Sequence, residues 1–226
     1  MCTNYNATPR DRLPSIVSAM RPPKPDWDWP HEIYNDYAAP IIRLGEDGPE
    51  VILASYAMVP KQHIPPGVKK FSTMNARAET IGEKRSYSKQ WRDGQLCLVP
   101  MESFYEPCYE TGVAVRWNIG MADDAPFAVA GLWRSWNEPD GSTAHSFTQI
   151  TVNADEHPLM KRFHKPGDEK RSLVIVPESE YEDWLECHDP ERARSYLQLY
   201  PAELMAARPA PAPPRKKKAE PNGVLF

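Results

Sequence analysis

Cysteine, glycine and long apolar stretches are all scarce in this sequence of 226 residues. Its four cysteines, Cys2, Cys97, Cys108 and Cys187, are widely spaced and form no CxxC pair. This spacing is that of neither a disulfide framework nor a zinc site, so we expect reduced thiols and no bound metal. No apolar run approaches the roughly 18–20 residues of a membrane helix, and the N-terminal residues lack the apolar core of a signal peptide. We therefore expect a cytoplasmic protein without contact to a membrane.

Proline, by contrast, is abundant, with 25 prolines against 11 glycines. Because proline disrupts helix interiors and central strands, the composition predicts short elements joined by many loops. The hydrophobic fraction of 41% and the charged fraction of 26% are those of an ordinary globular protein. We expect one domain over residues 1–207 and a disordered tail, rich in proline, alanine and basic residues, over 208–226.

The formal net charge of −4 is unevenly distributed along the chain. Residues 61–92 carry a net charge of +6, residues 161–171 carry +3 and the tail carries +4, so the remainder is strongly acidic. Such segregation would attract an anionic polymer to one face of the protein. Ordinary solvated surface charge explains the same pattern, and charge alone favours this simpler interpretation. The tail likewise suits a solvated extension at least as well as a nucleic-acid-binding arm.

Apolar and alternating segments dominate the middle of the chain and predict strands. Helical composition over 76–91 predicts a helix, and residues 177–200 predict two short ones. The order of these elements lacks the regular strand–helix alternation of a doubly wound sheet. We therefore expect an α+β fold with a mainly antiparallel, barrel-like sheet surrounded by short helices. The expected strands are residues 51–59, 95–100, 113–120, 127–133, 146–152 and 172–177.

Cys2 has a chemical capacity that few positions share. After removal of Met1 it would carry a free amine and a thiol two carbons apart. An N-terminal amine has a pKa of about 7.7–8.0, so part of it is nucleophilic at neutral pH. It can condense with an aldehyde to a Schiff base, which the thiol closes to a thiazolidine ring. Taken alone, Cys2 is more simply interpreted as an incidental residue behind a methionine that a housekeeping aminopeptidase removes.

Asn75 stands in the polar segment MNARAET, ahead of the expected helix. Its amide either caps that helix, which is the usual role of asparagine there, or orients a nucleophile. Arg77, Lys84 and Arg85 follow closely and offer cations to a phosphate group.

A carboxylate and an imidazole complete the set of candidate groups. Glu106 lies between an aromatic residue and a proline, where partial desolvation would suit a general acid or base. His164 lies among basic residues and is the candidate general base, whereas His157 precedes a proline and is the weaker candidate. Each residue type is also common as a solvated or structural side chain.

Five elements, in this order, resemble the SOS response-associated peptidase (SRAP) family. NARAET and CLVP followed by YE are modest signals alone, but all five in order with Cys at position 2 are specific. The resemblance spans residues 1 to about 200 and reverses the simpler interpretation of Cys2. The elements are Met1-Cys2, YNDYAAP (34–40), NARAET (75–80), CLVPMESFYEP (97–107) and RFHKPGDEKRSLVIV (162–176).

The resemblance implies a sensor of abasic sites in single-stranded DNA that acts in the DNA-damage or SOS response without a cofactor. An abasic sugar opens to an aldehyde, which the N-terminal cysteine captures as a thiazolidine DNA–protein crosslink. Carried over by position, Cys2 is both the autoprocessing nucleophile and the crosslinking residue, and Asn75 positions its amine. Glu106 supports autoprocessing and proton transfer, and His164 is the acid or base for sugar opening and crosslink reversal.

For DNA binding, the resemblance implies that Arg77 and Arg85 hold phosphates while Pro40 and Thr151 line the path of the strand. The chain departs from the family after Cys2, where Thr3-Asn4-Tyr5 replaces the frequent Gly-Arg-Phe and removes a possible phosphate contact. We interpret this as a divergent branch that keeps the chemistry and changes the DNA preference.

Two functions of other classes stay open at this point. One is a thiol peptidase that uses Cys2, His164 and Glu106 on protein substrates, and the other is a nucleic-acid-binding module without catalysis. The basic segments favour either DNA function over the peptidase. We expect a monomer without an obligate protein partner.

Overall fold

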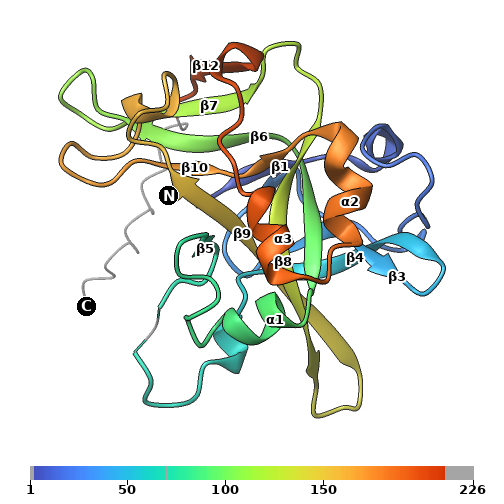
Figure 1. Ribbon diagram of the computed structural model, residues 1–226. Coiled ribbons are helices and arrows are strands. Elements are labelled where there is room, and N and C mark those ends of the chain that lie inside the picture. The colour runs from blue at the N-terminus through green and yellow to red at the C-terminus, as the bar shows by residue number, and fades with distance from the viewer. Residues whose placement is uncertain (1–2, 70, 212–226) are drawn as a thin grey trace, which may run out of the picture.

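The computed structural model describes residues 3–69 and 71–211, and all twelve strands in these ranges join one sheet (Figure 1). Three short helices accompany them, α1 (Ser88–Arg92), α2 (Tyr181–Leu185) and α3 (Pro190–Ser195). The strands are β1 (Tyr5–Ala7), β2 (Glu32–Ile33), β3 (Ala38–Gly45), β4 (Gly48–Tyr56), β5 (Asn75–Arg77), β6 (Leu96–Cys108), β7 (Val115–Met121), β8 (Phe127–Asn137), β9 (Thr143–Asn153), β10 (Arg171–Leu173), β11 (Ile175–Val176) and β12 (Met205–Pro209).

Five of these strands close into a barrel. β6 pairs with β3, β3 with β4, β4 with β9 and β9 with β8, and β8 returns to β6. The pairing of β4 with β9 is parallel, as is that of β5 with β9, and the other pairings around the barrel are antiparallel. The expected mainly antiparallel, barrel-like sheet with short helices is therefore confirmed.

Alternate residues of the barrel strands face two different cores. In β6, Leu96 and Leu98 belong to an outer core shared with α2 and α3, whereas Cys97 and Val99 belong to the inner core. Trp184 of α2 is fully buried in the outer core, and its indole Nε1 donates a hydrogen bond of 2.9 Å to the Cys97 carbonyl oxygen. This bond and the apolar contacts around it fix the helical layer on the barrel wall.

The helix expected over 76–91 is wrong for most of its length. Residues 75–77 instead form β5, whose parallel pairing with β9 places Asn75 beside Gln149 and Arg77 beside Thr151. Turns follow up to residue 87, and α1 occupies only the last part of the segment. Pairing with a buried strand has overridden the helical propensity of this sequence.

β6 is longer than the strand expected over 95–100, because it continues through Pro100 and Pro107 to Cys108. On one side of β6 the neighbouring strand changes from β3 to β1 between Leu98 and Met101, so Pro100 lies at the changeover. A missing N–H is tolerated at such a position. The extension matters for function because it carries Glu106 beyond the barrel core.

The remaining expectations for the fold hold at the level of elements. The other expected strands correspond to β4, β7, β8, β9 and the pair β10 and β11, and α2 and α3 fall within 177–200. At the C-terminal end, β12 pairs with β7 as far as Pro209, two residues into the segment expected as a tail. Residues 212–226 of that segment lie outside the described residues. In the part of the chain that is described, no helix is long and apolar enough to cross a membrane.

Candidate functional site

The N-terminal strand β1 lies directly against the part of β6 that leads to Glu106. Tyr5 pairs with Phe104, and the backbone N–H of Tyr105 donates to the Asn4 carbonyl oxygen at 3.2 Å. The Asn6 side chain adds a hydrogen bond of 3.0 Å to the Tyr105 hydroxyl. The described chain therefore begins beside Glu106. Cys2, the predicted nucleophile, lies outside the described residues.

Glu106 and His164, predicted separately from two distant segments, meet in the structure. The imidazole Nε2 of His164 lies 3.1 Å from Oε2 of Glu106, and the two side chains are only 7% and 3% exposed. The backbone of His164 is fixed as well, since its N–H donates to the Pro107 carbonyl oxygen at 2.9 Å. The site thus contains a buried carboxylate and imidazole in direct contact.

His164 adopts a backbone conformation that residues other than glycine rarely take, with a φ of 65°. The residue before it, Phe163, is fully buried and bridges to Cys108 at the end of β6. This anchoring holds the unfavourable turn that directs the imidazole towards Glu106. Strained residues of this kind cluster at functional sites.

Both ring nitrogens of His164 are buried. Nε2 lies 3.1 Å from the Glu106 carboxylate, and neither nitrogen makes a hydrogen bond within the described parts of the chain. An imidazole held by a carboxylate on one nitrogen can take up or release a proton at the other. Chemically, the pair is therefore suited to general acid–base catalysis.

Asn75 is connected to β1 through a short series of contacts. It pairs with Gln149 in β9, the Gln149 side-chain oxygen accepts a hydrogen bond of 3.0 Å from the Tyr56 hydroxyl, and the ring of Tyr56 meets that of Tyr5 edge-to-face. The Tyr87 hydroxyl donates to the Asn75 carbonyl oxygen at 3.1 Å. Asn75 is thus held at the same region of the barrel as the N-terminal strand.

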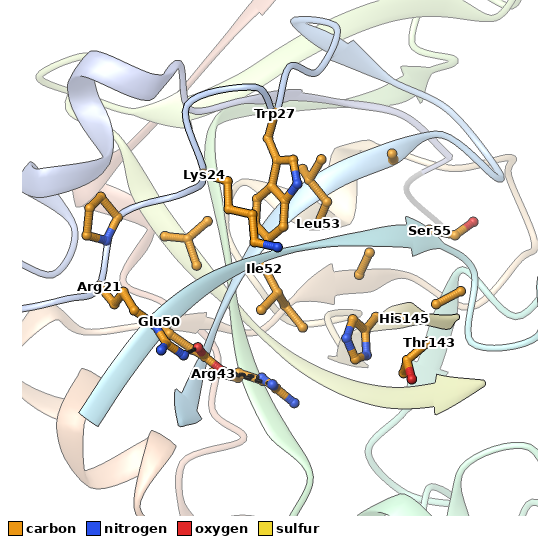
Figure 2. A pocket seen from close by; sticks show the side chains of 15 residues that line it. Arg21, Lys24, Trp27, Arg43, Glu50, Ile52, Leu53, Ser55, Thr143 and His145 are labelled. Atoms are coloured by element: carbon orange, nitrogen blue, oxygen red, sulfur yellow. Dashed lines mark hydrogen bonds and ion pairs between the residues drawn. The ribbon is translucent and has the colours of Figure 1, made fainter. Parts of the chain in front are cut away.

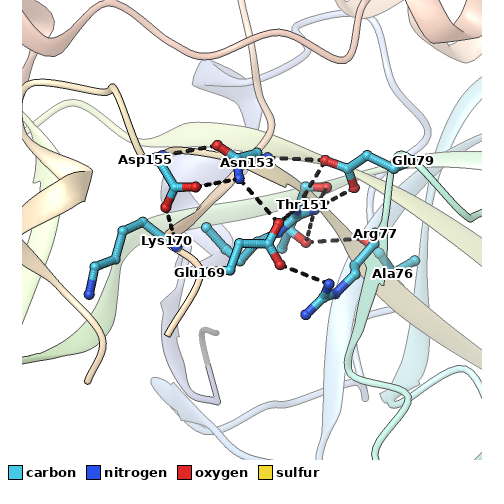
Figure 3. A network of polar contacts seen from close by, with 9 residues as sticks. Ala76, Arg77, Glu79, Thr151, Asn153, Asp155, Glu169 and Lys170 are labelled. Carbon is cyan, nitrogen blue, oxygen red and sulfur yellow. Dashed lines mark hydrogen bonds and ion pairs between the residues drawn. The ribbon is translucent and has the colours of Figure 1, made fainter. Parts of the chain in front are cut away.

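Arg77 lies in a network of charges on β5, β9 and β10, shown in Figure 3. Its guanidinium contacts the Glu169 carboxylate at 2.8 Å, and Glu169 also contacts Arg171 at 2.7 Å. The hydrogen bonds from Arg171 and Asn153, together with nearby positive charge, outweigh desolvation and lower the pKa of Glu169. Arg77 is half exposed, so Glu169 orders a cation that faces solvent.

The other predicted DNA contacts have different surroundings. Arg85 is exposed in the turns before α1 and is accessible to a ligand. Thr151 and Pro40 are buried in β9 and β3, and the Thr151 hydroxyl donates to the Ala76 carbonyl oxygen. Neither buried side chain presents surface to a passing strand, so burial argues against direct DNA contacts by these two residues. His157 is structural, since its Nε2 contacts the Tyr200 carbonyl oxygen at 2.8 Å and its Nδ1 accepts from two backbone N–H groups.

Two residues near the site were not found from the sequence. Glu32 of β2 contacts the side chains of Asn4 and Arg116, and the Arg116 guanidinium lies over the Tyr105 ring, 3.3 Å from its centroid. These contacts join residues 28 and 84 positions apart, which no local motif reveals. Asn4 occupies the position at which the resembled family frequently has an arginine. Through Glu32, Asn4 is linked to Arg116 of β7.

Comparison with known proteins decides the family. A family model described as SOS response associated peptidase (SRAP) matches residues 1–212. This chain belongs to the SRAP family. The match includes the N-terminal Met1-Cys2 and both members of the Glu106–His164 pair.

Relatives of this SRAP chain are found among both named proteins and solved structures. It is 34% identical over 151 residues to the abasic site processing protein YoqW of Bacillus subtilis, an alignment that covers 64% of each chain. It is 25% identical over 184 residues to the abasic site processing protein HMCES of Pongo abelii, covering 68% of this chain and 46% of that one. These alignments span less than two thirds of the curated relatives.

The fold is shared with solved structures over most of the chain. A crystal structure of a protein from Bordetella bronchiseptica superposes with a TM-score of 0.82 at 30% identity and covers 93% of this chain and 100% of its own. A phage-related protein from the same organism has a TM-score of 0.65 at 18% identity, covering 92% and 94%, which shows the fold alone.

Proposed function

We propose that this SRAP protein processes abasic sites in single-stranded DNA by capturing them covalently through Cys2. The observation that carries the proposal is the buried pair of Glu106 and His164 beside the N-terminal strand. Only Thr3 separates Asn4 from Cys2, so the Cα atoms of Asn4 and Cys2 can lie at most about 7 Å apart. The names of the relatives, abasic site processing proteins, support DNA with abasic sites as the target.

The chemistry begins with removal of Met1, for which the Cys2 thiol is the proposed nucleophile and Glu106 the proposed acid–base group. The thiol attacks the Met1 carbonyl carbon, the Met1–Cys2 amide bond breaks to free the Cys2 amine, and water hydrolyses the resulting thioester to release methionine. The released amine then attacks the aldehyde carbon of the ring-opened abasic sugar. The carbonyl oxygen leaves as water and a Schiff base forms. The thiol sulfur adds to the same carbon, its proton passes to the nitrogen, and a thiazolidine ring closes.

His164 is proposed to move the protons that open the sugar and, in reverse, release the crosslink. Opening the cyclic abasic sugar removes a proton from the C1′ hydroxyl and delivers one to the ring oxygen. The His164 imidazole suits this role because its Nε2 lies in contact with the Glu106 carboxylate. Asn75 is proposed to orient the Cys2 amine, while Arg77 and Arg85 hold the flanking phosphates.

We place this activity in the DNA-damage response, in the cytoplasm at the nucleoid, and expect the protein to act as a monomer. A multiple-turnover thiol peptidase is the alternative. The positively charged segments 61–92 and 161–171 favour DNA over a separate polypeptide as the substrate.

The test is the intact mass of the purified protein before and after incubation with a single-stranded oligonucleotide carrying one abasic site. Loss of Met1 and a DNA adduct, both abolished in Cys2→Ala, are expected. Cys187→Ala is the matched control, since that thiol is buried in the outer core and should leave both events intact. A processed protein that forms no adduct would support the peptidase or plain binding instead.

A further inference from the structure

A groove opens on the barrel wall where β4 and β9 separate. The two strands pair only at Ser55 with Ser146 and at Tyr56 with Phe147, although both strands begin at least three residues before these pairs. Between the separated strands lies a groove of about 680 Å³ (Figure 2). Its roof comes from the loop that precedes β2, and no step of the proposed capture chemistry uses it.

The groove is positively charged on a protein whose body is acidic. Arg21, Lys24 and Arg43 line it, and Glu50 is the single carboxylate among its lining residues. Glu50 is buried and contacts both arginines, with Arg43 at 2.8 Å. Glu50 therefore neutralises one of the three cations and holds two of them in place, which leaves an excess of about two positive charges.

An aromatic ring and open backbone add to this charge. Trp27 lines the groove, with the Lys24 ammonium 5.4 Å from its ring centroid. The Val51 N–H donates to the Arg21 carbonyl oxygen, away from β3, so the main-chain groups of Leu53, two residues on, face the groove as well. His145 lines the opposite side, where burial and the charge of Arg43 lower its pKa and keep the ring neutral at pH 7.

We propose that this groove binds single-stranded DNA flanking the captured site, with a base stacked on Trp27 and phosphates held by Arg21 and Lys24. Aromatic rings among cations are the usual platform for single strands. The groove and the candidate site share β4 and β9: Ser55 lines the end of the groove, and the next residue, Tyr56, is buried and donates to Gln149 beside Asn75. This inference rests on the proposed function for the identity of the DNA.

The experiment measures binding of fluorescein-labelled oligo-dT of 6 and 20 nucleotides, without an abasic site, to the Cys2→Ala protein. In that background, Trp27→Leu keeps an apolar side chain but loses the stacking surface. About tenfold weaker binding of the 20-mer is expected, with little change for the 6-mer, which the capture site alone can accommodate. Lys24→Ala should lower the salt dependence of 20-mer binding by about 0.7 in log–log slope.

Arg192→Ala is the control for a lost surface cation, since Arg192 lies on α3 outside the groove and outside both basic segments, and should change neither quantity. Unchanged 20-mer affinity in both groove variants would overturn the proposal. The proposal would also be overturned if binding of an oligo-glutamate peptide depended on Lys24 while binding of oligo-dT did not, because the groove would then bind an acidic peptide. Crosslinking is measured separately in the protein that retains Cys2, so a failure to form the crosslink counts against the proposed function alone.

Discussion

The contact between Glu106 and His164 can be tested by a double-mutant cycle. The perturbations are Glu106→Gln and His164→Asn, which keep polar side chains of similar size, and asparagine tolerates the positive φ at position 164. When the imidazole is protonated, the two opposite unit charges at 3.1 Å attract by about 5 kcal/mol at an effective dielectric constant of about 20. Desolvation of two buried groups offsets most of this attraction.

We therefore expect each single variant to lose about 2 kcal/mol of unfolding free energy, and the double variant to lose about 1–2 kcal/mol less than the sum. Urea denaturation followed by tryptophan fluorescence measures these values, and unchanged m-values would show that the comparison is sound. Single-turnover crosslinking should fall about 100-fold or more in each variant, without a further equal loss in the double variant.

His157→Asn is the matched control for the loss of a buried histidine. It breaks the contact with the Tyr200 carbonyl oxygen and should lower stability, but crosslinking by the folded protein should persist. Additive losses of both stability and crosslinking rate in the Glu106–His164 cycle would refute the idea that these two residues act as a unit.

Three further predictions concern the scaffold. Partial burial works to raise the pKa of Glu79, but the hydrogen bond and charge of Arg171 outweigh it and lower that pKa. The lowered pKa contributes folding stability that is present above about pH 4.3 and is lost as the pH falls through the lowered value. Arg171→Met should therefore flatten the acid limb of a stability–pH curve. Gly131→Ala should destabilise the barrel by about 1–3 kcal/mol in urea titrations, because the added methyl would lie 2.7 Å from a carbonyl oxygen of β9. Trp184→Phe should cost about 1–3 kcal/mol in the same assay, because it leaves a buried carbonyl oxygen of β6 without its donor.

The sequence was most informative where a residue's surroundings are set by its near neighbours. Alternating apolar residues located most of the barrel strands, because side chains of a strand alternate between its two faces. The helix predicted after Asn75 was wrong, since the structure of this segment depends on pairing with Gln149, far along the chain. Glu106 and His164 were identified through their motifs, but their direct contact joins residues 58 positions apart and required the fold. No sequence motif predicted the contact of Glu32 with Arg116.

The pairing of β1 with β6 has a consequence for how the protein is made. Asn6 contacts Tyr105 across 99 positions, so the first strand leaves the ribosome long before its partner. At about 5–20 residues per second, that interval lasts about 5–20 s. During it the N-terminal strand has no sheet to join, and His164 is translated later still. The proposed removal of Met1 uses Glu106 and therefore follows translation of β6, whereas the proposed sugar chemistry of His164 also requires the later strands of the barrel.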